Sequence, residues 1–319
     1  MKAFKVVMAV ACAGLLPSLA AASCGSAFCS VNSNWTSESA MTEPGSTFDL
    51  RYEYINQNQP RSGSDKVAVG QIPHHHDEVS TLNRNLLATY TRTFDSGWGV
   101  SVIAPILDRD HLHVHNHHGE QIPERWKFTE LGDVRVIGGY QLPYVGDTSK
   151  PANAGITFGL KLPTGKRNVA NDDGEVAERS LQPGTGTTDA IIGAYYHQKL
   201  PQWGASWFAQ TQYQHPLNSR DEFRPGDQFG VDVGYRHAIT DKLGALVQLN
   251  FLVKRRDSGA EAEPEDSGGR FVSISPGLSY AVTDKIQLYG FFQKPLYQHV
   301  NGVQLTANKA FVVGVSAHF

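Results

Sequence analysis

The sequence is poor in cysteine, in long apolar runs and in blocks of charge of one sign. Three of its 319 residues are cysteines, which excludes a disulfide-dense secreted scaffold. No stretch approaches about 18 consecutive apolar residues, so we expect no transmembrane helix. The net charge is -3 and no basic block is present, so we expect no nucleic-acid partner.

The N-terminal region has the features of a secretory signal. Two lysines precede the apolar run VVMAVACAGLL, and small residues follow it at positions 20–22. The apolar run is shorter than the roughly 20 residues that a spanning helix needs. We therefore predict a signal peptide over residues 1–23, which implies export across the inner membrane.

The exported chain would retain one cysteine pair, Cys24 and Cys29, in the sequence SCGSAFC. In an oxidising periplasm these residues are expected to form a disulfide. A metal site with two thiolates is one alternative, and lipidation of Cys24 is another. We expect residues 24–46 to form a periplasmic segment that precedes the main domain.

Segments that alternate apolar and polar residues dominate the rest of the chain. The clearest, at 47–57, carries two opposed sets of side chains: Phe48, Leu50, Tyr52 and Tyr54 on one face, and Asp49, Arg51 and Glu53 on the other. A soluble core would not accept three charges from one strand face, whereas the lumen of a membrane barrel would. This segment is therefore typical of a transmembrane β-strand.

Twelve such segments can be placed along the chain: 47–57, 80–94, 99–109, 127–142, 154–162, 187–199, 204–215, 227–238, 243–254, 270–282, 285–295 and 305–319. Short connections alternate with long polar ones, and the long ones are 58–79, 110–126, 163–186, 216–226, 255–269 and 296–304. Outer-membrane barrels sort their connections in this way, with short turns in the periplasm and long loops outside. The pattern predicts an all-β fold, a closed antiparallel transmembrane β-barrel over residues 47–319.

The chain stops at AFVVGVSAHF, an alternating strand with a terminal phenylalanine. This ending resembles the assembly signal of bacterial outer-membrane β-barrels. The resemblance implies that the outer-membrane assembly machinery recognises Phe319. It also implies that the barrel is surrounded by outer-membrane lipid in a Gram-negative cell.

Three glycine-rich stretches carry a family resemblance: LGDVRVIGGYQLP (131–143), ITFGLKLPTGKR (156–167) and LQPGTGTTDAIIGAYY (181–196). They resemble the porin-like outer-membrane transporter barrels grouped under the phenol-degradation meta-pathway name. The resemblance covers the chain from about residue 47. It implies a twelve-stranded barrel and solute passage, and it implies no catalytic residues.

Charged residues are predicted on the inner faces of several strands: Asp49, Arg51, Glu53, Asp133, Arg135, Asp232 and Arg236. Such residues would line a polar conduit for a small solute. Alternatively, they would pair with one another inside a plugged structural or interaction barrel. No G-x-S-x-G motif is present, and we predict no enzymatic activity. An outer-membrane enzyme stays as a further alternative, because a fold does not fix a function.

Histidines are concentrated in DRDHLHVHNHHGEQ (108–121), which holds five of the 13 in the chain. Alternate residues of an extended segment point to one side about 7 Å apart. Three more histidines occupy 74–76 in the preceding long connection. Both connections are predicted to lie on the outer surface of the cell.

Imidazole is a common ligand for copper, zinc and nickel. The sequence therefore predicts a site for one of these metals built from the following residues: His74, His75, His76, His111, His113, His115, His117 and His118. Nearby carboxylates that offer oxygen ligands are Asp77, Glu78, Asp108, Asp110 and Glu120. A solvated histidine-containing loop and a pH-sensitive gate are the alternatives.

Overall fold

The computed structural model describes residues 44–72, 77–117, 120–143 and 151–319. The predicted signal peptide and four of the predicted metal ligands, His74–His76 and His118, lie outside the described residues, as do Cys24 and Cys29. The described chain is almost entirely β-structure, with one short 3₁₀ turn, η2 (Pro201–Trp203). Among the described residues no helix is long and apolar enough to cross a membrane.

The strands, in chain order, are β1 (Gly45–Ser62), β2 (Asp65–Lys66), β3 (Asp77–Thr93), β4 (Trp98–His117), β5 (Glu120–Leu131), β6 (Arg135–Gln141), β7 (Ala152–Lys161), β8 (Asp189–Leu200), β9 (Ala205–Pro216), β10 (Gln228–Ala238), β11 (Leu243–Lys254), β12 (Gly269–Ala281), β13 (Ile286–Val300) and β14 (Val303–His318). Strand β2 is a two-residue strand that pairs antiparallel with the end of β1, and β5 and β6 together form one interrupted strand of the wall. Twelve wall strands result from the fourteen, as the sequence predicts.

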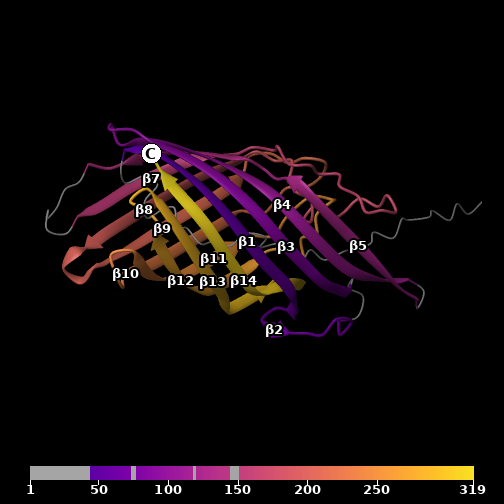
Figure 1. Ribbon diagram of the computed structural model, residues 1–319. Coiled ribbons are helices and arrows are strands. Elements are labelled where there is room, and N and C mark those ends of the chain that lie inside the picture. The colour runs from indigo at the N-terminus through magenta and orange to yellow at the C-terminus, as the bar shows by residue number, and fades with distance from the viewer. Residues whose placement is uncertain (1–43, 73–76, 118–119, 144–150) are drawn as a thin grey trace, which may run out of the picture.

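The wall closes on itself through its first and last strands (Figure 1). Strand β14 pairs antiparallel with β1 from Thr47↔His318 to Ser62↔Val303. Ser46 N donates to Phe319 O, and Phe319 N donates to Ser46 O, each at 2.8 Å. Closure pairs the backbone groups of both strands, which would otherwise be exposed at a sheet edge.

The barrel has a turn end, which carries the start of β1, Phe319 and the short turns, and a loop end, which carries the long connections. Two predicted loops at the loop end are wrong. Residues 110–126 are mostly strand, because β4 and β5 continue as a hairpin to His117 and Glu120. Residues 296–304 are likewise mostly strand, because β13 and β14 are joined by two residues. Polar sequence marks these hairpins as outside the lipid, but it does not prevent strand pairing.

The predicted strand 127–142 is interrupted at 132–134. Beyond this break only β6 pairs with β7, and β5 pairs with β4 alone. The other side of β5 faces the loop 162–188. Trp126 Nε1 donates to Glu175 O at 2.9 Å, and Thr164 Oγ1 donates to Gly132 O at 2.9 Å. This loop therefore covers an edge that would otherwise template aggregation.

Large apolar side chains are exposed around the outside of the wall, among them Phe48, Val102, Phe158, Phe229 and Val313. Buried polar side chains lie on the opposite face of the same strands. This distribution inverts that of a soluble protein and suits a lipid-facing exterior. The interior also holds an apolar cluster, which is formed by Ile55, Leu246, Tyr289, Phe291, Ala310 and Val312.

Close strand packing generates a first prediction, at Gly159. A Cβ atom there would lie 2.2 Å from Val136 O and 2.8 Å from Ile137 Cα, both rigid backbone atoms of β6. At Gly290 the nearest atom, Val312 O, would be 3.4 Å away. We expect Gly159→Ala to lower the free energy of unfolding by about 1–3 kcal/mol, and Gly290→Ala to change it far less. Urea unfolding in detergent micelles measures both, and equal effects would contradict the argument.

Candidate functional site

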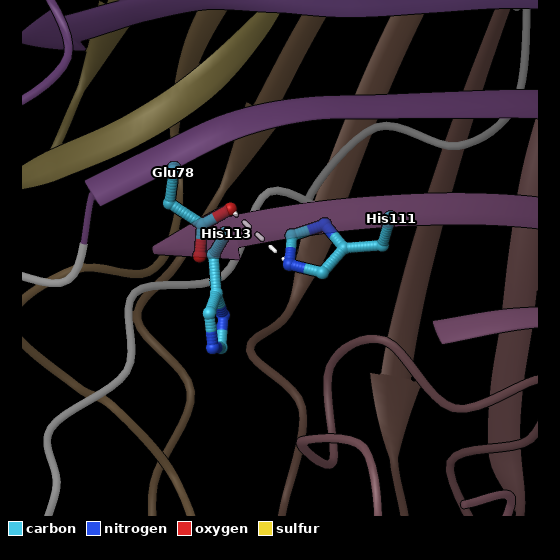
Figure 2. Close-up of side chains that lie close together, drawn as sticks. All are labelled: Glu78, His111 and His113. Atoms are coloured by element: carbon cyan, nitrogen blue, oxygen red, sulfur yellow. Dashed lines mark ion pairs between the residues drawn. The ribbon is translucent and has the colours of Figure 1, made fainter. Parts of the chain in front are cut away.

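Glu78, His111 and His113 lie together inside the loop end of the barrel (Figure 2). Each offers one ligand atom, and the three atoms lie within 4.8 Å of one another. All three side chains are buried, with exposed fractions of 2%, 0% and 2%. A buried set of two imidazoles and one carboxylate is a typical donor set for a divalent transition metal.

A β-bulge brings Glu78 into this group. Along β3 the residues 81, 83 and 85 face inward, and regular alternation would turn residue 78 outward. The register between β3 and β4 shifts between Glu78 and Ser80, so Glu78 lies opposite His113. Bulges of this kind redirect side chains near functional sites. The inward position of the carboxylate is therefore a product of strand pairing.

His111 is held by a neighbour across the same strand pair. Its Nδ1 lies 2.8 Å from Thr81 Oγ1, and its Nε2 lies 3.5 Å from Glu78 Oε2. When Nδ1 donates to Thr81, Nε2 carries a lone pair that faces the carboxylate. Two acceptors that face one another in a buried space attract a cation or a proton between them. Second partners of this kind orient metal-binding histidines in other proteins.

His113 is oriented from β5. Its Nε2 lies 2.7 Å from Glu124 Oε2, which fixes the ring and, when Nε2 donates, leaves the lone pair on Nδ1. The ring centroid lies 5.5 Å from that of His111 and 4.8 Å from that of Trp126. Trp126 is 4% exposed and closes the group from one side.

Two further carboxyl groups reach the site from the loops between β7 and β8 and between β11 and β12. Both carboxylate oxygens of Glu178 and one of Glu263 are fully shielded from solvent. Burial raises the pKa of Glu178 to about 8. Burial, together with the neighbouring carboxylates of Glu178 and Glu78, raises the pKa of Glu263 to about 11. A concentration of buried acidic groups disfavours their ionisation unless a cation is close.

The other predicted ligands are not all brought to this site. His115 is only half-buried, and the side chain of His117 lies outside the described residues. Asp108 instead pairs with Arg84, and Asp110 pairs with Arg125. The side chains of Asp77 and Glu120 also lie outside the described residues.

Sequence reasoning missed several residues that shape the site: Thr81, Glu124, Trp126, Glu178 and Glu263. Glu178 and Glu263 belong to long polar loops, where an acidic residue is unremarkable in sequence. Only Glu124 has a signal in the sequence that could have identified it. If the histidine-rich segment forms a β-hairpin, Glu124 lies opposite His113.

The predicted lumen residues lie on the inner side of the wall. Asp49, Glu53 and Asp232 are 2%, 0% and 3% exposed. Tyr289 Oη donates to Asp49, and Arg51 forms an ion pair with Glu53 at 3.0 Å. The side-chain amides of Gln210 and Asn250 each donate to Asp232 at 2.8 Å.

Asp133 lies in the interruption between β5 and β6 and binds the loop 162–188. It accepts hydrogen bonds from Gly165 N and Thr185 N and lies 3.2 Å from Lys161 Nζ. Lys161 also pairs with Asp189 at 3.0 Å. Arg135 and Arg236, in contrast, form no ion pair with a described residue, and the buried Nε of Arg236 has no hydrogen-bond partner among them.

Comparison with known proteins gives a family and a fold. The model of a family described as "Putative MetA-pathway of phenol degradation" matches residues 74–306. No curated protein matches the sequence. The structure is similar to that of an outer membrane channel from Pseudomonas putida F1, with a TM-score of 0.65 and 12% identity, over 91% of this chain and 100% of the other.

Two porins of solved structure are more distant. A NanC porin matches with a TM-score of 0.46 and 10% identity, over 85% of this chain and 100% of its own. A KdgM porin matches with a TM-score of 0.42 and 10% identity, over 86% and 99%.

The closed wall, the apolar exterior and the polar interior define an outer-membrane β-barrel of the porin-like class. Because the family model matches most of the chain, the protein belongs to the family of the MetA-pathway of phenol degradation. Its location is the bacterial outer membrane. Barrels of this class carry their long loops outside and their short turns in the periplasm.

Glu178 generates a second prediction. Its pKa is raised from the ordinary 4.5 to about 8, so the folded protein holds this proton more tightly than the unfolded chain. The contribution of Glu178 to the free energy of unfolding is therefore fully present below pH 4.5 and is lost as the pH rises towards 8. We expect Glu178→Gln to reduce this fall in chelator-treated protein, and the exposed Glu175→Gln to leave it unchanged. Unfolding midpoints across this pH range provide the measurement, and identical profiles for the wild type and Glu178→Gln would contradict the burial argument.

Proposed function

We propose that the protein is an outer-membrane channel for a small solute, with a transition-metal site at its outer mouth. The observation that best supports a channel is the series of polar side chains along the inner wall. It runs from Arg109 near the loop end to Arg236 near the turn end. A barrel that served only as a structural support would gain more from a continuous apolar core. Similarity of fold to an outer membrane channel supports the same proposal.

The apolar cluster inside the wall sets the competing proposal, a plugged barrel. Ile55 of β1, Phe291 of β13 and Leu246 of β11 belong to this cluster. Phe291 and Leu246 lie opposite Gly277 of β12 from its two sides, so the cluster runs along neighbouring strands of the inner face. It forms an apolar patch on one side of the lumen, and the width that remains beside it decides whether solute passes.

Conductance in planar bilayers tests the channel, our third prediction. We expect stepwise currents from the purified protein. Phe291→Ala should enlarge each step, because the side chain belongs to the apolar patch on the inner face. Phe292→Ala is the matched control, since this neighbour is 37% exposed on the outer face. An absence of current from both the wild type and Phe291→Ala would favour the plugged barrel.

The metal proposal rests on buried acceptors that face one another. Both carboxylate oxygens of Glu78 and the Nε2 atom of His111 are buried and have no hydrogen-bond partner among the described residues. Glu78 and His111 are nonetheless only 3.5 Å apart at their nearest atoms. A divalent ion would supply the missing positive charge and coordinate both groups. Copper, zinc and nickel all accept this donor set.

Metal titration is the fourth prediction. Calorimetry with copper, zinc and nickel should show one binding event that His111→Asn weakens by about tenfold or more. Asparagine can still contact Thr81, so the strand pair is preserved. His237→Asn is the control, because His237 is exposed on the outer face of β10. Binding should also weaken as the pH falls, but only well below 6.5, because burial lowers the pKa of both His111 and His113.

Unchanged affinity in His111→Asn would overturn this metal site. His115→Asn distinguishes the site of Glu78, His111 and His113 from a wider surface of histidines. His115 is only half-buried and is not part of the group of three. We expect this variant to bind with wild-type affinity. A loss equal to that of His111→Asn would instead place the ion farther out along the hairpin.

A further inference from the structure

A basic cavity opens at the turn end of the barrel. Its volume is about 580 Å³, and the ionisable side chains that line it are Lys199, Arg236, Lys285, Asp284, His197 and His318. Three of these carry a fixed positive charge and one carries a negative charge. The cavity lies at the opposite end from the Glu78, His111 and His113 site and shares no residue with it.

Arg236 gives this cavity a specific donor group. Its Nε is shielded from solvent and has no hydrogen-bond partner among the described residues. The Oγ of Ser279, a residue 1% exposed, is likewise without a partner in the described chain. Buried donors without acceptors are costly, and they are normally satisfied by water or a ligand.

Gly244 lets these two donors approach the backbone of β11 closely. A Cβ atom at this position would lie 2.9 Å from Ser279 Oγ and 3.0 Å from Arg236 Nε, which is closer than side chains normally tolerate. The guanidinium and the hydroxyl therefore converge on one point of the inner wall. A guanidinium fork with a neighbouring hydroxyl is suited to carboxylate or phosphate oxygens.

Most charges of the inner wall are compensated by the protein. The carboxylates of Asp49, Asp189 and Asp232 accept hydrogen bonds from protein donors. Arg236, in contrast, has no ion pair with a described residue, so it brings an uncompensated positive charge to the cavity.

We propose that the periplasmic cavity is a binding site for small oxyanions, carboxylates or phosphates, and that it makes the channel selective for anions. This inference rests on the proposed channel function for its transport part only. Arg236 is the principal ligand, and Lys199 and Lys285, which also line the cavity, attract the anion electrostatically. Clefts lined by charge of one sign raise the local concentration of the opposite ion.

The test combines current with binding. Reversal potentials in a potassium chloride gradient should show chloride preferred over potassium, and Arg236→Gln should reduce the permeability ratio about threefold or more. Arg236→Lys should retain most of the preference. Lys242→Gln is the matched control, since Lys242 is exposed at the same end and does not line the cavity.

Binding is measured separately by the phosphorus NMR line width of inorganic phosphate. The wild type should broaden the line, Arg236→Gln should not, and succinate should compete, which tests the shared oxyanion chemistry. Broadening without any current would reject the channel and retain the site. Current that prefers potassium, or Arg236→Gln behaving as Lys242→Gln does in both measurements, would overturn the inference and leave the channel in place.

Discussion

The structure depends on one constraint: every backbone donor and acceptor of the wall must be paired within the protein, because the surrounding lipid offers no partner. The pairing of β14 with β1 meets this constraint where the sheet would otherwise have two edges. Closure fixes the register of all the strands between them, and register decides which side chains face inward. The interior, and therefore every candidate site, follows from that pairing.

The two ends of the barrel differ in the charge that they leave uncompensated. At the outer mouth, acidic groups from two strands and two loops face a pair of histidines, with no described cation in ion-pair contact with Glu78 other than the His111 imidazole. At the periplasmic end, Arg236 and Lys285 face a cavity with one carboxylate. Buried or confined charges are stable only with a counter-charge. The proposed cation and anion sites therefore have the same physical origin, at opposite ends of one lumen.

The loop 162–188 connects the wall to the outer site. Its Ala177 and Leu181 pack against Trp126, and Arg109 donates to Leu181 O from the inner wall. The same loop carries Glu178 into the acidic group, and its Glu175 O accepts a hydrogen bond from Trp126 of β5. One segment therefore protects an edge, fills the mouth and supplies a site residue, so changes in the loop affect folding and the site together.

The sequence by itself determined the barrel class, because alternation with period two and the sorting of short and long connections are local properties. It also placed Asp49, Glu53 and Asp232 on inner faces, and it identified the histidine-rich segment as unusual. Alternation could not reveal the bulge at Glu78–Ser80, because an extra residue in one strand is visible only against its partner. The polar composition of 110–126 and 296–304 predicted loops there. This was wrong because a β-hairpin that extends into water beyond the lipid can stay paired without apolar side chains. The meeting of Glu178 and Glu263 with Glu78, and of Arg236 with Ser279, was decided only by the tertiary structure. These residues are far apart in the chain and are brought together by the folding of the loops and by the register of the paired strands.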